Sequence, residues 1–487
     1  METIHLKSAD PLSQAMLRSA ALNGVELIWE RAEKLQPQDG FLRLGLSCPY
    51  DCLLGPCRID PFGQGADKGI CGLDRDSMVA ATLYRLCHRG LLETLNIVPA
   101  AARDLENTCP VKVKDLANQV LGSHGLPPLS GSSLLDTVLR TAQGPMNHEK
   151  LLLGALHLSL LNLVLAGSSQ RGEHPGFGAC SAGYGVINGD SACIGFCGTP
   201  SPELVRALHR QTVGAQTETA HLVALGAWIP GDGGYLPLAC SSGASELLLS
   251  SGAVNLVVAG LDADPALFQL CRRLNIPAVT GTAEASAMEI LQTACSRHKQ
   301  SSRPQLFSDV PPARDFTVHS SGKSPSGLVS RKQSGRVGLI CGSDMPHMTM
   351  GKISQELSAA LNNDGMILGG WGDACWWIMN HEQDPSFVAF DPLTGPLLAV
   401  LDLVEAGGFD RLDGICYTGL KRCREFATAL GLAFLGCRVS IAVPIPILGS
   451  REVCRSLSEK LRVSGGELVH FDHPAETEEL TAWFANR

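Results

Sequence analysis

The segment Gly45–Gly72, GLSCPYDCLLGPCRIDPFGQGADKGICG, carries the most specific pattern of the chain. It holds four cysteines at the spacing C-x3-C-x4-C-x13-C, framed by glycines: Cys48, Cys52, Cys57 and Cys71. Thiolates from such a compact loop can surround a 4Fe–4S cube, and glycines let backbone N–H groups approach the sulfurs. Structural zinc also accepts four thiolates, but it favours paired C-x2-C knuckles. The spacing therefore predicts a 4Fe–4S cluster, with zinc as the alternative.

Around this segment, length and composition predict a multidomain α/β protein. The 487 residues suit about three domains. A hydrophobic share of 45%, a charged share of 18% and 52 glycines suit strands and helices joined by tight turns. The net charge of −9 gives no basic footprint, so we expect no nucleic-acid partner and instead a small molecule or a redox protein.

The start of the chain and its cysteine content indicate a compartment. No charged region followed by an apolar stretch occurs in Met1–Leu17, so we expect a cytoplasmic protein. The most apolar run, Leu151–Ala166, is shorter than the ~20 residues of a membrane span and is predicted to be a buried helix. Because the cytosol keeps thiols reduced, the 18 cysteines indicate metal binding or buried thiols rather than disulfides.

The hydrophobic pattern divides the chain into four parts. Residues 1–165 are predicted to form a helical iron–sulfur domain, with helices at Pro11–Lys34 and Asp74–Leu95 on either side of the cysteine loop. Short apolar runs alternating with helical stretches predict α/β domains with parallel sheets at 166–295 and 337–487. Residues 296–336, with ten serines and eight Lys or Arg, are predicted to be a solvated linker.

Ligands of open parallel sheets bind beyond the carboxyl ends of the strands. The side chains that follow the predicted strands are therefore the candidates for a second site: Cys197, Asp262, Cys341, Asp373, Cys375 and Cys416.

Two stretches of this sequence resemble a known family. Residues 9–41 and 47–72, with their QPQ, GPCRI-x-PFG and GICG elements, are similar to the N-terminus of the nickel-containing anaerobic carbon monoxide dehydrogenases. The similarity continues in SSGAVNLVVAGLDADPAL (250–267) and GICYTGLKRC (414–423). The resemblance implies a shortened, divergent member of the carbon monoxide dehydrogenase and hybrid-cluster superfamily, with two Rossmann-like α/β domains.

The resemblance also implies a function. The four cysteines of the loop would hold an electron-relay cubane, and the protein would be an oxidoreductase converting CO and water to CO2, two electrons and two protons. It would pass electrons to a ferredoxin-like carrier or a partner redox enzyme, and it would form a homodimer through its N-terminal region. The catalytic residues are left unassigned.

Two departures concern a further cluster that the family shares between subunits. Asp39 and Ser47 stand where the family has cysteines. A carboxylate and a hydroxyl are poor replacements for soft thiolates, so this shared cluster is expected to be missing.

More departures concern the active nickel–iron cluster, which the family holds with one histidine and five cysteines. Gly198 stands at the histidine, beside Cys197, and Asp262 stands at a cysteine. Asp373 stands at another cysteine, with Cys375 two residues beyond. Near the place of a proton-accepting lysine lies Arg424, which stays charged and is a poor proton acceptor.

Two interpretations follow for this second site. In one, four cysteines bind a second iron–sulfur or nickel–iron–sulfur cluster: Cys197, Cys341, Cys375 and Cys416. Cys416 would be a ligand, Cys341 and Cys375 would face the same volume, and Cys197 would approach it across the cleft. In the other they are buried thiols beside a metal-free pocket. Three functions stay open: a carbon monoxide dehydrogenase-like enzyme, a hybrid-cluster-like reductase of a small nitrogen compound, and a non-catalytic electron-relay or scaffold subunit.

Overall fold

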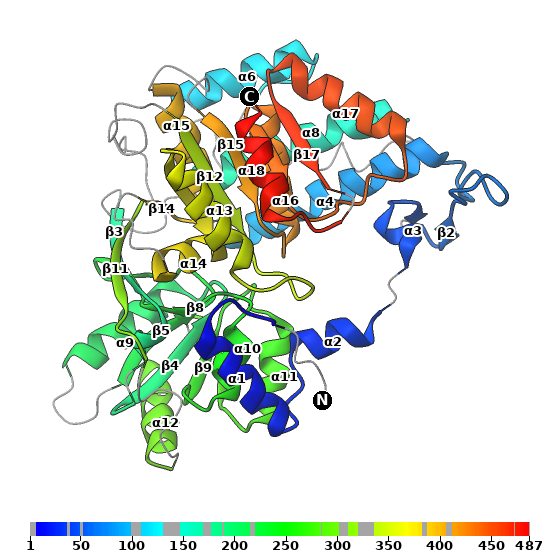
Figure 1. Cartoon of the computed structure of the whole chain (residues 1–487). Coiled ribbons are helices and arrows are strands. Elements are labelled where there is room, and N and C mark those ends of the chain that lie inside the picture. The colour runs from blue at the N-terminus through cyan, green and yellow to red at the C-terminus, as the bar shows by residue number, and fades with distance from the viewer. Residues whose placement is uncertain are drawn as a thin grey trace.

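The computed structural model describes most of the chain. It covers residues 6–36, 39–48, 52–98, 109–129, 147–168, 177–187, 189–214, 220–283, 285–300, 310–319, 336–381, 387–405, 412–471 and 473–486. The molecule has two halves, one above the other, with the cysteine loop at one side (Figure 1).

One mixed sheet runs through both halves, and the α/β class predicted from sequence is confirmed. Within the described residues its strand order is β10-β9-β4-β5-β8-β3-β11-β14-β13-β12-β15-β16-β17, with β6 and β7 attached at β3. The strands of the lower half are β3 (Phe177–Ala182), β4 (Ala192–Cys197), β5 (Ala220–Leu225), β6 (Pro230–Gly231), β7 (Gly234–Tyr235), β8 (Leu238–Cys240), β9 (Leu256–Ala259) and β10 (Ala278–Thr280). Those of the upper half are β11 (Arg314–His319), β12 (Val337–Gly342), β13 (Ile367–Gly372), β14 (Val388–Phe390), β15 (Leu412–Tyr417), β16 (Arg438–Ile441) and β17 (Glu467–His470).

The sheet reverses direction where its halves join. Strand β11 pairs antiparallel with β3 and parallel with β14, while the main-path strands on either side of this junction are parallel within each half. Residues at the carboxyl ends of both sets of strands nevertheless line one cavity, so these ends approach each other where the halves meet. The prediction of a linker at 296–336 did not include strand β11. In this strand exposed residues alternate with half-buried ones and only Val318 is fully buried, so its sequence is as polar as that of a connector. The domain boundaries themselves stay a prediction.

Helices cover both halves. Those of the lower half are α9 (Pro202–Gly214), η2 (Tyr184–Val186), α10 (Ser245–Ser250), α11 (Pro265–Arg273) and α12 (Ala287–Gln300). Those of the upper half are α13 (Lys352–Asn363), α14 (Asp373–His381), α15 (Gly395–Glu405), α16 (Cys423–Phe434), α17 (Arg451–Val463) and α18 (Thr477–Ala485).

The N-terminal elements divide between the two halves. They are α1 (Pro11–Leu22), α2 (Ile28–Lys34), α3 (Gly40–Arg43), β1 (Ser47–Cys48), β2 (Cys57–Arg58), α4 (Arg75–Ile97), α6 (Val111–Ser123) and α8 (His148–Ser168). Helices α1 and α2 lie beside α10 and α11 of the lower half, whereas α3, α4, α6 and α8 lie with the upper half (Figure 1). Buried Ser13 hydrogen-bonds the Tyr184 hydroxyl at 2.7 Å, which fixes α1 to the lower half.

Helices α4, α8 and α16 form one layer joined by a buried amide. Asn162 of α8 accepts a hydrogen bond from the Thr94 hydroxyl of α4 (2.6 Å) and donates to the Thr428 hydroxyl of α16 (3.0 Å). Helix α8 is the one described helix long and apolar enough to cross a membrane, but 83% of its most apolar window is buried inside the protein. Its apolar surface is therefore used in the core, as the sequence predicted.

Candidate functional site

The cysteine loop is ordered by a small ladder and a few polar contacts. In the antiparallel pair β1–β2, Cys48 lies directly opposite Cys57. The carboxylate of Asp60 accepts backbone N–H groups of Gln64 (2.6 Å) and Gly65 (2.7 Å), so one acid organises the turn that follows β2. Arg75 donates to the carbonyl of Gly449 at 2.5 Å and so ties the base of α4 to the upper half.

The chemistry around the sulfurs suits an iron–sulfur cluster. The N–H of Ile70 donates to Cys57 Sγ at 3.4 Å, and Arg85 donates to Cys48 Sγ at 3.5 Å. Gly69 lies so close to Cys57 that an added Cβ would be 3.6 Å from Sγ. Donors aimed at sulfur stabilise thiolates and clusters, so these cysteines fit a cubane. Cys48 is buried, whereas Cys52 and Cys71 are exposed.

The two positions of the expected missing shared cluster serve structural roles. Asp39 caps α3 by accepting the N–H of Phe41 (2.9 Å), and its other oxygen accepts from Arg58 at 2.7 Å. Ser47 is buried in β1, with no hydrogen-bond partner for its hydroxyl among the described residues. Both arrangements are consistent with the prediction that no cluster binds there, which stays a prediction.

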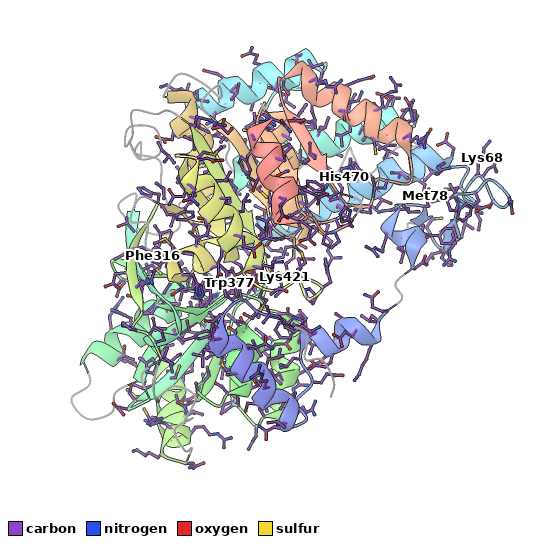
Figure 2. The ribbon with its side chains drawn as sticks, in the orientation of Figure 1. Lys68, Met78, Phe316, Trp377, Lys421 and His470 are labelled. Carbon is purple, nitrogen blue, oxygen red and sulfur yellow. The ribbon has the colours of Figure 1, made fainter. Side chains whose placement is uncertain are left out.

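A cavity of about 150 Å³ lies where the carboxyl ends of the two sets of strands meet. Cys197, Gly226 and Asp262 line it from the lower half, and Gly342 and Asp373 line it from the upper half. Figure 2 shows Lys421 and Trp377 at this junction of the halves. Lys421 also lines the cavity. Of the six side chains singled out from sequence, three line this cavity: Cys197, Asp262 and Asp373.

Asp373 closes part of this cavity by hydrogen bonds that cross between the halves. Its Oδ1 accepts the N–H of Ser242 at 2.7 Å, and its Oδ2 accepts the Ser242 hydroxyl at 2.5 Å and the N–H of Asp344 at 2.9 Å. Three donors therefore occupy this carboxylate. As a replacement for a metal-binding cysteine, Asp373 already has all its partners from protein.

Asp262 is likewise held by the opposite half. Arg424 donates to its Oδ2 at 3.0 Å, and Arg422 donates to its backbone carbonyl at 2.5 Å. Burial acts to raise the pKa of Asp262, but the charges of Arg424 and Arg422 outweigh burial and lower it. Two residues along the chain, Asp264 pairs with Lys421 at 3.3 Å. Basic side chains of the upper half thus meet acidic side chains of the lower half.

The expectation that Cys341 and Cys416 face the same volume is not met. Cys341 is in register with Tyr417, while Cys416 is in register with Ile340. Because successive strand residues point to opposite faces, Cys341 and Cys416 lie on opposite faces of the sheet. They accordingly belong to different hydrophobic cores.

Only Cys197 of the four second-site cysteines lines the cavity. Cys375 donates its thiol to the carbonyl of Gly370 at 3.0 Å. Burial raises the pKa of Cys197 and of Cys416 to about 12, so both are thiols at neutral pH. Metal ligation by these cysteines stays a prediction. These cysteines are packed thiols, and the acids beside the cavity form ion pairs and hydrogen bonds. The residues present at the cavity therefore do not fit the nickel–iron cluster.

A further acid, half-buried, lies next to Ser343 of the cavity lining: Asp344. Asp344 accepts from the Trp377 indole at 2.9 Å and from the Ser241 hydroxyl at 2.5 Å. Burial, with the nearby charge of Asp373, raises the pKa of Asp344 to about 7. Trp377 thus donates a hydrogen bond to Asp344 in addition to packing in the core.

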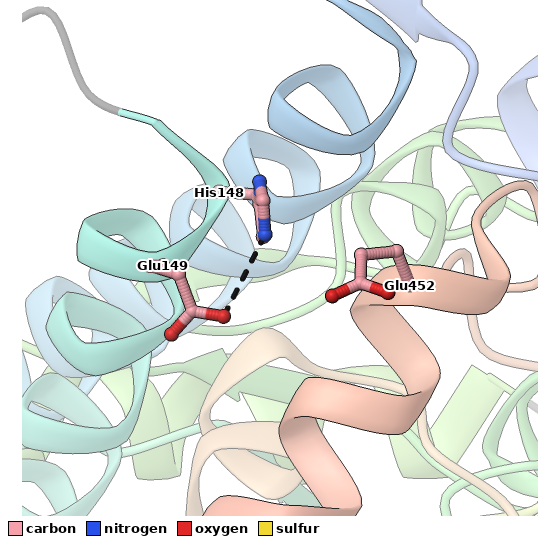
Figure 3. Close-up of side chains that lie close together, drawn as sticks. All are labelled: His148, Glu149 and Glu452. Atoms are coloured by element: carbon pink, nitrogen blue, oxygen red, sulfur yellow. Dashed lines mark ion pairs between the residues drawn. The ribbon is translucent and has the colours of Figure 1, made fainter.

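Elsewhere, one group in the described part of the chain brings three metal-ligating side chains within 4.8 Å of one another: His148, Glu149 and Glu452 (Figure 3). Its carboxylates already have partners. Ser456 donates to Glu149 at 2.6 Å, Lys460 donates to the other Glu149 oxygen, and Arg455 pairs with Glu452 at 2.6 Å. This surface cluster is explained by ion pairs, and we assign no site to it.

Sequence reasoning missed several cavity residues, among them Ser242, Glu246 and Lys421. Ser242 and Glu246 follow β8, a strand of three residues that is too short to stand out in a hydrophobic pattern. Lys421 lies in the GICYTGLKRC stretch, from which the prediction took Cys416 as a site residue and left out Lys421. The run Lys421–Arg424, with three basic residues after a strand end, was the available signal.

No family model matches the chain. Among curated proteins, carbon monoxide dehydrogenase 1 of Methanosarcina mazei is 42% identical over 125 residues, or 26% of this chain and 18% of that protein. The carbon monoxide dehydrogenase of Rhodospirillum rubrum is 51% identical over 83 residues, which cover 17% of this chain and 13% of that protein. The chain therefore spans less than a fifth of these relatives in the matched regions.

Solved structures extend the similarity to the whole fold. Carbon monoxide dehydrogenase IV of Carboxydothermus hydrogenoformans has a TM-score of 0.77 at 17% identity, covering 98% of both chains. A nickel-free carbon monoxide dehydrogenase of Thermococcus sp. AM4 has a TM-score of 0.76 at 16% identity, covering 99% of this chain and 96% of that one. The resemblance predicted from the cysteine segment is confirmed. The chain is thus similar in sequence to carbon monoxide dehydrogenases over the matched segments, and its whole fold is similar to theirs.

Proposed function

We propose that this protein is an iron–sulfur oxidoreductase with a carbon monoxide dehydrogenase-like fold, in which the nickel–iron cluster is lost and electrons pass through the N-terminal cubane. The observation that carries this proposal is the replacement of metal ligation by protein contacts at the junction of the halves. Asp373 is bound by Ser242, and Asp262 is bound by Arg424.

The cubane would be held by the four cysteines of the loop: Cys48, Cys52, Cys57 and Cys71. When bound, a 4Fe–4S cluster supplies a one-electron relay. The chain's own contribution is to place the N–H of Ile70 and the guanidinium of Arg85 against two of the sulfurs. Such donors raise the reduction potential by stabilising the more negative, reduced state.

An exposed apolar surface on the same loop supports electron exchange with a partner. Leu53 is 96% exposed and Phe62 is 83% exposed, and Leu54 and Ile70 are exposed beside them in the sequence. Exposed apolar patches mark interaction sites. We propose that this loop meets a second copy of the chain, a ferredoxin-like carrier or a partner redox enzyme. A cytoplasmic location and the division into a helical cluster domain with two Rossmann-like domains are parts of the same proposal.

Metal analysis of protein purified without oxygen tests the proposal. We expect about four irons and no nickel per chain, a broad visible absorption that bleaches on reduction, and no CO-dependent reduction of a viologen dye. Nickel together with about eight or more irons would contradict it and favour a carbon monoxide dehydrogenase. Iron beyond one cubane without nickel would favour the hybrid-cluster-like reductase.

A further inference from the structure

The cavity between the halves holds a buried carboxylate oxygen without a partner. Glu246, in α10, is 5% exposed and lines the cavity. Arg31 of α2 donates to its Oε1, whereas Oε2 is buried and has no hydrogen-bond partner in the described part of the chain. A buried charged acceptor left without a donor costs more than a neutral one, so Oε2 needs a partner that the protein does not supply.

A second acceptor opens onto the same cavity. Asp262 uses Oδ2 for Arg424, while its Oδ1 is buried and makes no hydrogen bond within the described residues. Two nearby donors are directed to other acids, since Lys421 pairs with Asp264 and the N–H of Ser242 goes to Asp373. In the described part of the chain, Glu246 Oε2 and Asp262 Oδ1 therefore remain as acceptors, and a ligand beside them would serve them as a donor.

We propose that this cavity binds a small primary ammonium compound, with Glu246 and Asp262 accepting from its N–H groups. An ammonium group has three donors and no acceptor, which matches two free carboxylate oxygens. Leu225, Trp228 and Leu267 line the same cavity and suit a short alkyl chain. The volume of about 150 Å³ is below the roughly 300–1,000 Å³ of pockets for drug-sized ligands, so it suits a small molecule.

A metal ion is a weaker match for the same oxygens. The described residues contain no group of three His, Cys, Asp or Glu ligand atoms within 4.8 Å of one another at this cavity. Divalent cations take more ligands than the two oxygens supply. The inference rests on the proposed loss of the nickel–iron cluster from this junction, because a cluster would fill the space.

Calorimetric titration of the full-length protein, purified without oxygen, tests the ammonium site. Ethylammonium chloride at pH 7 should bind saturably with one site per chain, and tetramethylammonium, which has no N–H donor, should not bind. Glu246→Gln should weaken ethylammonium binding by about tenfold or more, because a charged acceptor is lost. Glu203→Gln, a change of an exposed acid in α9, should leave the affinity unchanged.

A second variant keeps the test valid if Glu246→Gln does not fold. Ala227→Leu extends a cavity-lining side chain without altering either carboxylate and should also abolish binding. Absence of saturable heat in the unsubstituted protein, or equal affinity in Glu246→Gln, would overturn the inference and leave water as the partner of the oxygens. Binding of magnesium that displaces ethylammonium would overturn it in favour of a metal. Metal content is measured separately, so nickel in the protein would refute the proposed function independently of the titration.

Discussion

The cysteine loop and the cavity between the halves differ in the contacts that hold them in place. The loop keeps the full set of thiols, yet by itself it has only two-residue strands and exposes Cys52 and Cys71. At the cavity, where the sequence resemblance implies metal-binding cysteines, Asp373 and Asp262 are held by hydrogen bonds and an ion pair. A site that retains its ligands can depend on metal for order, whereas a site that loses them is stable only if protein contacts replace the metal.

The largest effect is expected from a substitution that removes a cluster ligand from the cysteine loop. Cys57→Ser should lower bound iron from about four atoms per chain to about one or none and disorder residues 52–73, because a glycine-rich loop has little core of its own. Iron analysis, visible absorption and hydrogen exchange of this loop measure the change. Cys454→Ser, in α17, is the matched control and should keep its iron. Full iron content in Cys57→Ser would rule out the cluster assignment.

The next effect is on the cavity. Asp373→Ala should reduce the free energy of unfolding by about 2–4 kcal/mol, because the N–H groups of Ser242 and Asp344 lose their acceptor in a buried place. Iron content should be unchanged. Urea unfolding measures the loss, with the exposed acid change Asp364→Ala as control. A loss below that of the control would mean that these hydrogen bonds do not hold the halves together.

Breaking the ion pair should cost less, because both partners are partly exposed. Arg424→Ala should destabilise the protein by about 1–3 kcal/mol at pH 7 by leaving Asp262 without its cation. The pKa of Asp262 is lowered in the folded protein, so its stabilising effect is present at neutral pH and is lost as the pH falls through that lowered pKa. The difference between variant and unsubstituted protein should therefore shrink below about pH 4. A difference independent of pH would point to packing rather than charge.

The smallest effect concerns Asp344. Its pKa is raised to about 7 in the folded protein, so ionisation opposes folding and the free energy of unfolding should fall as the pH rises from about 4 to about 7. Asp344→Asn keeps an acceptor for Trp377 and should flatten this pH dependence. Melting temperatures at pH 5.5 and 8 measure the difference between the two proteins. An unchanged slope would show that another group titrates.

Local patterns in the sequence determined much of this protein. The spacing of four cysteines predicted a cluster loop, and the helix predicted at Asp74–Leu95 is found as α4, Arg75–Ile97. Alternating apolar runs and helical stretches predicted the α/β class. The similarity to carbon monoxide dehydrogenases was also readable there. Each of these signals lies in neighbouring residues, where spacing and propensity act directly.

Only the tertiary structure decided what the strand ends do together. Matching of positions placed Cys341 and Cys416 at one site, but the register of β12 and β15 turns them to opposite faces. The meeting of the two halves brings Asp262 to Arg424, some 160 positions along the chain, and Ser242 to Asp373. Such pairs depend on strand register and on how the two halves meet, and neither is encoded within any one stretch of sequence.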